Sequence, residues 1–261
     1  MDAVNKTLYI PLYGKAYVSK KGVILNDKKA QEIWDSTDIK LSNKCKSKYL
    51  CYYMSMRSSV FDSFVEDKLR LHDDAVVLHI GCGLDSRNLR VKSDNHPWYD
   101  IDLPQVIAKR MQYYHQTLSY SMIQGDVCDK EWLDIIPHNK TAIVVLEGVS
   151  MYLQLHSINA LFSRLSEHFE HLHILVDCYT EFAAKASKYK NPVNDIGVNK
   201  VYGVDNPELL VKNTDVTFVC EHSLTPDYLI KQLSFFERAI FKNIYAGKVS
   251  KQLYRLYEFK K

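Results

Sequence analysis

The residues Ala75–Pro104 read AVVLHIGCGLDSRNLRVKSDNHPWYDIDLP, and this stretch decides the fold. It starts with a short, β-branched apolar run, Ala75–Ile80, which predicts a buried strand rather than a helix. The run ends at Gly81-Cys82-Gly83, which predicts a tight turn where a glycine accepts positive φ and lets a ligand lie directly on the backbone. A second predicted strand, Trp98–Asp102, ends in an acid roughly twenty residues beyond the glycines, the spacing found in nucleotide-binding βαβ units.

Strand, glycine turn and strand-end acid together predict a nucleoside site, in which the Asp102 carboxylate accepts both ribose hydroxyls. A dinucleotide is disfavoured, because its motif G-x-G-x-x-G/A needs a small third residue and this chain has Ser86 followed by Arg87. The phosphate-loop pattern G-x-x-x-x-G-K-[ST] is also missing from the sequence. A ligand without phosphates therefore fits better, and S-adenosylmethionine is the common one. The alternative is that the glycine turn is an ordinary strand exit.

Two linked motifs, IGCGLDSR at 80–87 and WYDIDLPQVIAKR at 98–110, resemble the S-adenosylmethionine motifs of the leucine carboxyl methyltransferase family. The similarity is greatest to the bacterial polyketide O-methyltransferases of the tetracenomycin type. It extends to IPLYGKAY at 10–17, to Arg57 and to LEGVSMYL at 146–153, so that it covers residues 8–175. The last third of the chain matches only loosely. The resemblance implies methyl transfer from S-adenosylmethionine, with S-adenosylhomocysteine as the product.

Further acids end later strands of the predicted sheet. Asp126 follows a strand at 120–123, and Glu147-Gly148 follows the apolar strand 141–146. Ligands of open α/β sheets bind beyond the carboxyl ends of the strands. Asp126 is therefore expected to bind the exocyclic amine of adenine, with the Val127 N–H reading a ring nitrogen, or else to form an Asx turn. Glu147 is expected to face the amino group or the sulfonium side of the cofactor. The alternative is a buried acid held by backbone N–H groups.

Two basic residues precede the first strand. The resemblance places Lys15 and Arg57 near the methionine carboxylate. A guanidinium can donate two parallel hydrogen bonds to a carboxylate. The alternatives are a solvated lysine and an arginine paired with a nearby acid such as Asp62. The full set of cofactor-binding positions that the resemblance implies is Lys15, Arg57, Gly81, Cys82, Gly83, Asp102, Leu103, Asp126, Val127, Glu147 and Gly148. Candidate aromatic walls of the acceptor site are Tyr13, Tyr17, Tyr152 and Tyr179.

The expected fold is α/β, a class I methyltransferase of Rossmann-like type with a mostly parallel seven-stranded sheet, helices on both faces and an N-terminal helical cap. One domain is expected over 1–261, with the cap at 1–72, the core at 73–261 and a substrate-covering segment at 179–210. Within the cap, Asn26-Asp27 is expected to start a short helix and 46–71 to form a long one. Residues 179–189 are expected to be helical, and 216–220 and 253–259 to be two late strands. The resemblance implies that the last strand is antiparallel and inserted near the edge of the sheet.

Bulk composition is that of an ordinary globular chain: 261 residues, 46% hydrophobic and 25% charged. The formal net charge of +3 is too small to argue for nucleic acid or a membrane surface as partner. Six cysteines without C-x-x-C pairs indicate reduced residues. With no signal-peptide pattern and no transmembrane-length run, a cytoplasmic location is expected. The oligomeric state is open.

The sequence predicts an O-methyltransferase that acts on a hydroxyl or carboxylate of a small molecule, with a polyketide-like aromatic acceptor suggested by the resemblance. A sulfonium methyl is already activated, so alignment of the acceptor is the main requirement. No general base is assigned among ten histidines, and His79 is expected in the core. No metal is expected, since neither H-E-x-x-H nor a Cys/His ligand spacing is recognised. The alternatives are a protein C-terminal carboxyl methyltransferase, a non-catalytic binder of the cofactor and, less favoured, an oxidoreductase.

Overall fold

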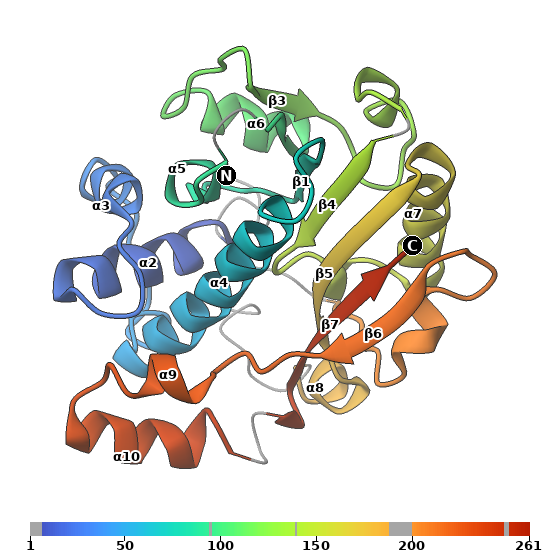
Figure 1. Ribbon diagram of the computed structural model, residues 1–261. Coiled ribbons are helices and arrows are strands. Elements are labelled where there is room, and N and C mark those ends of the chain that lie inside the picture. The colour runs from blue at the N-terminus through green and yellow to red at the C-terminus, as the bar shows by residue number, and fades with distance from the viewer. Residues whose placement is uncertain (1–6, 94–95, 139, 188–199, 248–250) are drawn as a thin grey trace.

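The structure is a computed structural model that describes residues 7–93, 96–138, 140–187, 200–247 and 251–261. Its centre is a seven-stranded sheet with the strand order β3-β2-β1-β4-β5-β7-β6 (Figure 1). The strands are β1 (Val76–Ile80), β2 (Trp98–Asp102), β3 (Tyr120–Gln124), β4 (Thr141–Leu146), β5 (His171–Tyr179), β6 (Thr217–Glu221) and β7 (Tyr254–Lys260). This confirms the predicted class I methyltransferase architecture, with its antiparallel final strand inserted next to the edge.

Chain direction in the sheet fixes where a ligand can bind. The strands β1 to β5 pair in parallel, whereas β7 is antiparallel to both β5 and β6. The chain leaves β1 towards β2 on one side, and β4 returns to the other side of β1. At such a switch point the loops diverge and open a crevice beyond the carboxyl ends. The turn after β1 and the end of β4 border this crevice.

Helices cover both faces of the sheet (Figure 1). The α-helices are α2 (Tyr9–Lys21), α3 (Lys28–Asp35), α4 (Lys48–Leu69), α5 (Arg87–Arg90), α6 (Pro104–Arg110), α7 (Leu155–His168), α8 (Glu181–Ala186), α9 (Asp227–Ile230) and α10 (Phe235–Ile244). Within the described ranges, the 3₁₀ helices are η1 (Leu133–Ile135), η2 (Ser150–Tyr152) and η4 (Pro207–Leu210). None of the helices in the described part of the chain is long and apolar enough to cross a bilayer.

The central strands are apolar on both sides, and successive residues supply the two cores. In β4, Ile143 and Val145 pack with α4 on one face, while Ala142 and Val144 pack with α7 on the other. All six residues of β4 are buried, as a sheet covered on both faces requires. Helices α2 and α3 from the N-terminal part of the chain, and α9 and α10 from its C-terminal part, extend the layer on the α4 face.

Local start signals in the sequence act as predicted. Asp27 accepts a hydrogen bond from the Ala30 backbone N–H at 2.8 Å and so caps α3. Pro104 occupies the first turn of α6, where its missing N–H costs nothing. The helix prediction over 179–189 was wrong at its start, because pairing with β7 extends β5 to Tyr179. Helix α8 begins only at Glu181, and residues 188–189 lie outside the described part.

Candidate active site

Two neighbouring cavities lie beyond the carboxyl ends of the parallel strands. The first, of about 200 Å³, is lined by the N-terminal part of α2, by Arg57, by the turn after β1 and by Glu147. The second, of about 370 Å³, is lined by the ends of β1, β2, β3 and β4. Residues that line both are Thr7, Leu8, Gly81, Gly148 and Tyr152. The two cavities therefore meet at the predicted glycine turn.

The second cavity holds the acid that the sequence singled out. The two carboxylate oxygens of Asp102 accept backbone N–H groups, Oδ2 from Gly83 and Oδ1 from Leu103, each at 2.8 Å. Burial raises the pKa of Asp102, and these two N–H donors oppose that rise. Each carboxylate oxygen has lone-pair capacity for one more donor. Two hydroxyl groups on adjacent carbons, as in a ribose, match this arrangement.

The far end of the second cavity is formed by Gly125, Asp126 and Val127. The Asp126 Oδ1 atom accepts the Cys128 backbone N–H at 2.8 Å, so this residue forms the Asx turn that was its alternative interpretation. The same residue lines the cavity together with Val127 and Leu103. The Asx turn and a contact with a ligand do not exclude each other, because Asp126 both accepts the Cys128 N–H and lines the cavity.

The first cavity has a charged wall built around Arg57. This buried guanidinium donates from Nε to Glu147 Oε1 at 3.0 Å and from Nη1 to Asp177 Oδ2 at 2.7 Å. Burial alone would lower the pKa of Arg57, but Asp177 and Glu147 raise it above its ordinary value. The alternative interpretation of Arg57, a pair with a nearby acid, is confirmed, but the partners are Glu147 and Asp177 and not Asp62. Arg87 and Arg90 contact Asp62 instead.

Glu147 is held by several donors at once. Ser58 Oγ donates to its Oε1 at 2.7 Å, and Arg87 donates to its Oε2. Burial would raise the pKa of Glu147, but Arg57 and Arg87 outweigh it and lower the pKa to about 2. Glu147 is thus an ionised wall of the cavity, held by arginines and a hydroxyl rather than by backbone N–H groups. A carboxylate has room for a further cation, such as an ammonium group.

Lys15 and Gly148 complete the charged wall. Lys15 is 4% exposed, and its Nζ lies 2.9 Å from Asp85 Oδ2, so the solvated alternative is wrong. A Cβ at Gly148 would lie 3.4 Å from Arg57 Nη2, so the glycine keeps space open beside this nitrogen. Gly148 N–H in turn donates to Asp177 Oδ1 at 2.7 Å. The site therefore presents both a guanidinium edge and a carboxylate to the same small volume.

The four candidate tyrosines divide into two pairs. Tyr152 and Tyr179 line the first cavity, as predicted. Tyr13 and Tyr17 line neither cavity, and this prediction was wrong. The Tyr13 ring packs edge-on against Trp34, with centroids 4.8 Å apart, and the Tyr17 ring lies against Tyr52. Both point from α2 into the helical layer, because Lys15 and Leu12 occupy the face of α2 that meets the cavity.

Sequence reasoning missed two contributors to the site. Asp177 lies level with Glu147 across the sheet, because Leu146 of β4 pairs with Val176 of β5. In the sequence it directly follows the apolar run 172–176, and this was an available signal. Burial raises the pKa of Asp177 to about 6, although Arg57 and the Gly148 N–H lower it. Tyr254, at the start of β7, lines the first cavity and packs edge-on against Tyr179 at 4.6 Å. No local pattern reveals Tyr254, because only the β5–β7 pairing brings it there.

The turn after β1 allows a direct test of how tightly it is packed. Gly81 has φ +68°, and a Cβ there would lie 2.1 Å from Val149 Cγ2. Gly22 has φ +70° with nothing within 4 Å of its Cβ position, so it serves as the matched control. We expect Gly22→Ala to cost about 1–2 kcal/mol of unfolding free energy from backbone strain. Gly81→Ala should cost about 1–3 kcal/mol more, from forced displacement of Val149.

Urea denaturation of the two alanine variants measures both costs on one scale. Equal losses of unfolding free energy for Gly22→Ala and Gly81→Ala would show that the Val149 side chain moves away at no cost. The turn would then not be tightly packed against Val149.

The residues present fit S-adenosylmethionine. The second cavity offers a carboxylate for two vicinal hydroxyls at Asp102 and an apolar slot between Leu103 and Val127. The first cavity offers Arg57 for a carboxylate and Glu147 for an ammonium group. The glycine turn between them lets a ligand run along the backbone from one cavity to the other. A zwitterionic amino acid joined to a nucleoside has this order of groups.

Comparison with known proteins agrees with this geometry. The family model for leucine carboxyl methyltransferase matches residues 5–166. The tetracenomycin polyketide synthesis O-methyltransferase TcmP of Streptomyces glaucescens is 30% identical over 212 residues, 80% of this chain and 78% of that protein. An S-adenosyl-L-methionine-dependent methyltransferase, dpfgK of Gibberella zeae, is 26% identical over 65% of this chain and 62% of its own length.

Solved structures show the same fold at low identity. A candidate methyltransferase from Thermobifida fusca superposes with a TM-score of 0.58 at 12% identity, over 95% of this chain and 94% of its own. Magnesium protoporphyrin IX methyltransferase from Synechocystis PCC 6803, solved with bound SAH, gives 0.54 at 12% identity, over 89% and 92%. With the fold, the crevice and the family match in agreement, this chain belongs to the leucine carboxyl methyltransferase family and is an S-adenosylmethionine-dependent methyltransferase.

Proposed function

We propose that the protein transfers the methyl group of S-adenosylmethionine to a hydroxyl or carboxylate oxygen of a small aromatic acceptor. The observation that carries this proposal is the meeting of two chemically different cavities at the Gly81 turn. The second cavity takes the adenosine, and the charged wall of the first takes the amino-acid part. The remaining, aromatic part of the first cavity takes the acceptor.

Each contact of the cofactor has a proposed residue. Asp102 accepts the ribose hydroxyls, while Asp126 and the Val127 N–H read adenine. Arg57 binds the methionine carboxylate, with Lys15 adding positive charge next to it, and Glu147 faces the ammonium group. Gly81, Cys82, Gly83, Leu103 and Gly148 contribute backbone surface along the ligand.

Bound S-adenosylmethionine supplies a methyl group on a positively charged sulfur, which needs no further activation. The protein's task is to hold an acceptor oxygen in line with that methyl, and such positioning can replace several kcal/mol of barrier, up to about 7–11. A carboxylate acceptor arrives ionised, whereas a hydroxyl acceptor must lose a proton. His79 lines the first cavity, but it is buried against Arg87 at 2.9 Å and burial lowers its pKa. We therefore assign it a structural role.

The walls of the first cavity support an aromatic acceptor. Tyr152, Tyr179 and Tyr254 line it, together with Met54 and Met151. Aromatic and thioether groups favour flat, apolar ligands. The relative from Streptomyces glaucescens is named for polyketide synthesis, which agrees with such an acceptor.

We propose that the segment 179–210 covers this end of the first cavity. Of this segment, residues 188–199 lie outside the described part of the chain. We also propose that the enzyme works in the cytoplasm.

Calorimetric titration with S-adenosylhomocysteine, and with NAD in parallel, tests the cofactor assignment. We expect micromolar binding of S-adenosylhomocysteine, about −8 kcal/mol, and no binding of NAD, because Ser86-Arg87 replaces the small residue that a pyrophosphate requires. Labelled methyl transfer to a panel of phenols and aromatic carboxylic acids then tests the acceptor. Failure to bind S-adenosylhomocysteine would overturn the whole proposal. Binding with transfer only to peptide C-termini would overturn the small-molecule acceptor alone.

A further inference from the structure

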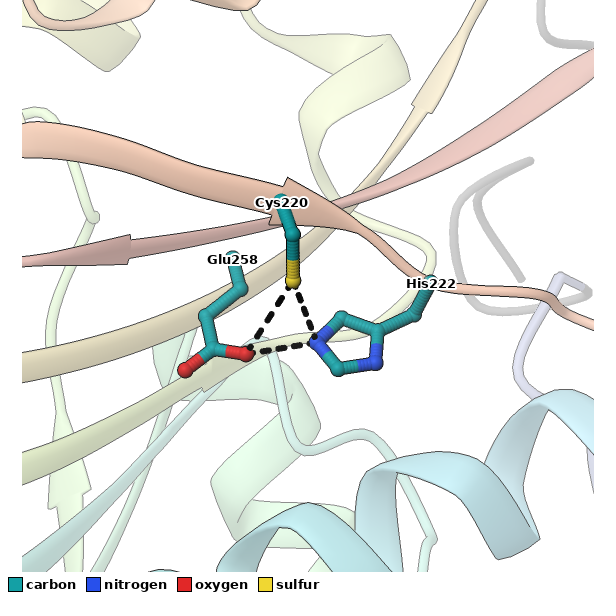
Figure 2. A group of neighbouring side chains, drawn as sticks. All are labelled: Cys220, His222 and Glu258. Carbon is teal, nitrogen blue, oxygen red and sulfur yellow. Dashed lines mark hydrogen bonds and ion pairs between the residues drawn. The ribbon is translucent and has the colours of Figure 1, made fainter.

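Three potential metal ligands converge outside the cofactor cavities (Figure 2). Cys220 lies on β6, His222 directly follows that strand, and Glu258 lies on β7. Cys220 Sγ is 3.5 Å from His222 Nε2 and 3.7 Å from Glu258 Oε2, and the last two atoms are 2.6 Å apart. The side chains of Cys220 on β6, Glu258 on β7 and His222 just beyond β6 point towards one another.

A bulge in the edge strand creates this convergence. Phe218 lies opposite Phe259, and Cys220 lies opposite Glu258, so Val219 is an extra residue. Regular pairing would place Cys220 opposite Tyr257 on the other face of the sheet. The bulge therefore moves the thiol to the face of Glu258. His222 N–H donates to Leu256 O at 2.8 Å, which keeps the imidazole in register on the same face.

The spacing of the three atoms resembles one face of a zinc tetrahedron. With Zn–S of about 2.3 Å and Zn–N or Zn–O of about 2.0–2.1 Å, tetrahedral angles put sulfur about 3.5 Å from each of the other two donors. The distances of 3.5 and 3.7 Å from Cys220 Sγ already match. The nitrogen and oxygen would be about 3.3 Å apart around zinc. Their 2.6 Å hydrogen bond therefore has to open by about 0.7 Å when a metal replaces the bridging proton.

The donor chemistry also favours zinc over a hard cation. A thiolate, an imidazole and a carboxylate are zinc ligands, whereas Ca²⁺ and Mg²⁺ prefer oxygen alone. One thiolate and one carboxylate balance the charge of a divalent ion. Lys68 Nζ lies 2.7 Å from Glu258 Oε1, the other carboxylate oxygen, and so orients the group without occupying Oε2. The Glu258 side chain is 9% exposed and that of His222 34%, which leaves a solvent-side position for a fourth ligand.

We propose that Cys220, His222 and Glu258 bind one zinc-class divalent ion, with water as the fourth ligand. The ion joins the edge strand β6 to β7 and stabilises the sheet. Glu258 lies four residues along β7 from Tyr254, which lines the first cavity, a separation of about 13 Å at the usual rise per residue. The ion is therefore a structural site and takes no part in methyl transfer. This revises the expectation, drawn from ligand spacing, that the chain binds no metal.

The test is metal binding by the full chain after treatment with a chelator. Wild-type protein should bind one equivalent of Zn²⁺, and its melting temperature should rise when Zn²⁺ is added. With Co²⁺ as the probe, a thiolate-to-metal absorption band and the strong visible bands of a tetrahedral site should appear. Cys220→Ser should abolish the thiolate band. It should also weaken Zn²⁺ affinity more than about 100-fold, since even changes around metal ligands cost about 10- to 100-fold.

Matched controls separate this site from adventitious binding. Cys128→Ser removes an exposed thiol elsewhere, and His171→Gln removes an exposed imidazole on β5. Both variants should keep wild-type stoichiometry and the cobalt spectrum. Glu258→Gln retains the shape of the side chain and should weaken Zn²⁺ binding while S-adenosylhomocysteine affinity stays unchanged. Absence of stoichiometric Zn²⁺ binding in wild type, or an unchanged cobalt spectrum in Cys220→Ser, would overturn the proposal and leave a plain His–Glu hydrogen bond.

Discussion

Replacing Asp102 with alanine is expected to weaken S-adenosylhomocysteine binding by about 10- to 150-fold. The physical reason is the loss of hydrogen bonds from ribose to a carboxylate, since bonds to a charged group are worth about 1.5–3 kcal/mol. Asp102 also orders the turn by accepting the N–H groups of Gly83 and Leu103. The alanine variant should therefore also lose some unfolding free energy. Calorimetry measures the first effect, and urea denaturation measures the second.

Two further variants make the Asp102 result specific. Asp102→Asn keeps the shape and one acceptor oxygen, so its affinity should fall between wild type and Asp102→Ala. Asp73 is an exposed acid ahead of β1, and Asp73→Ala should leave the affinity unchanged. If Asp102→Ala binds S-adenosylhomocysteine as tightly as wild type while remaining folded, the ribose assignment is wrong.

Replacing Arg57 with alanine is expected to destabilise the fold by about 3–5 kcal/mol. The change leaves the buried Asp177 without its cation, while Glu147 keeps only the guanidinium of Arg87, and an unpaired buried charge is costly. Arg57→Lys should recover part of the loss, because an ammonium group keeps the charge but cannot fork onto two acids. Arg70 ends the same helix in an exposed ion pair, so Arg70→Ala should change stability little. Urea denaturation provides the comparison.

Ligand affinity distinguishes a binding role of Arg57 from a purely structural one. Methylthioadenosine lacks the amino-acid carboxylate that Arg57 is proposed to bind. Arg57→Lys should therefore weaken S-adenosylhomocysteine binding much more than methylthioadenosine binding, under conditions where the variant remains folded. Equal losses for the two ligands would mean that Arg57 acts only by holding Glu147 and Asp177 in place.

Much of the fold was predictable from the sequence, because its signals are local. Strand patterning predicted the strand that leads into Gly81, and glycine conformation predicted the turn after it. The same patterning placed Asp102 at the end of the next strand. The rule that parallel strands end on the binding side of the sheet predicted that Glu147 lies at the site. These positions do line the two cavities. Asp177 obeys the same rule, so its place in the charged wall was within reach of the same reasoning.

The tertiary structure alone decided which side chains share a volume. Helical spacing allows Tyr13 and Tyr17 to face a ligand or the helical layer, and packing against Trp34 and Tyr52 selects the layer. Tyr254 reaches the first cavity only through pairing with a strand 75 residues earlier, at Tyr179. Likewise, Cys220 meets Glu258 only because an edge-strand bulge reverses its face. The physical reason is that period and propensity act within a segment, whereas register between distant strands is set by how the whole core packs.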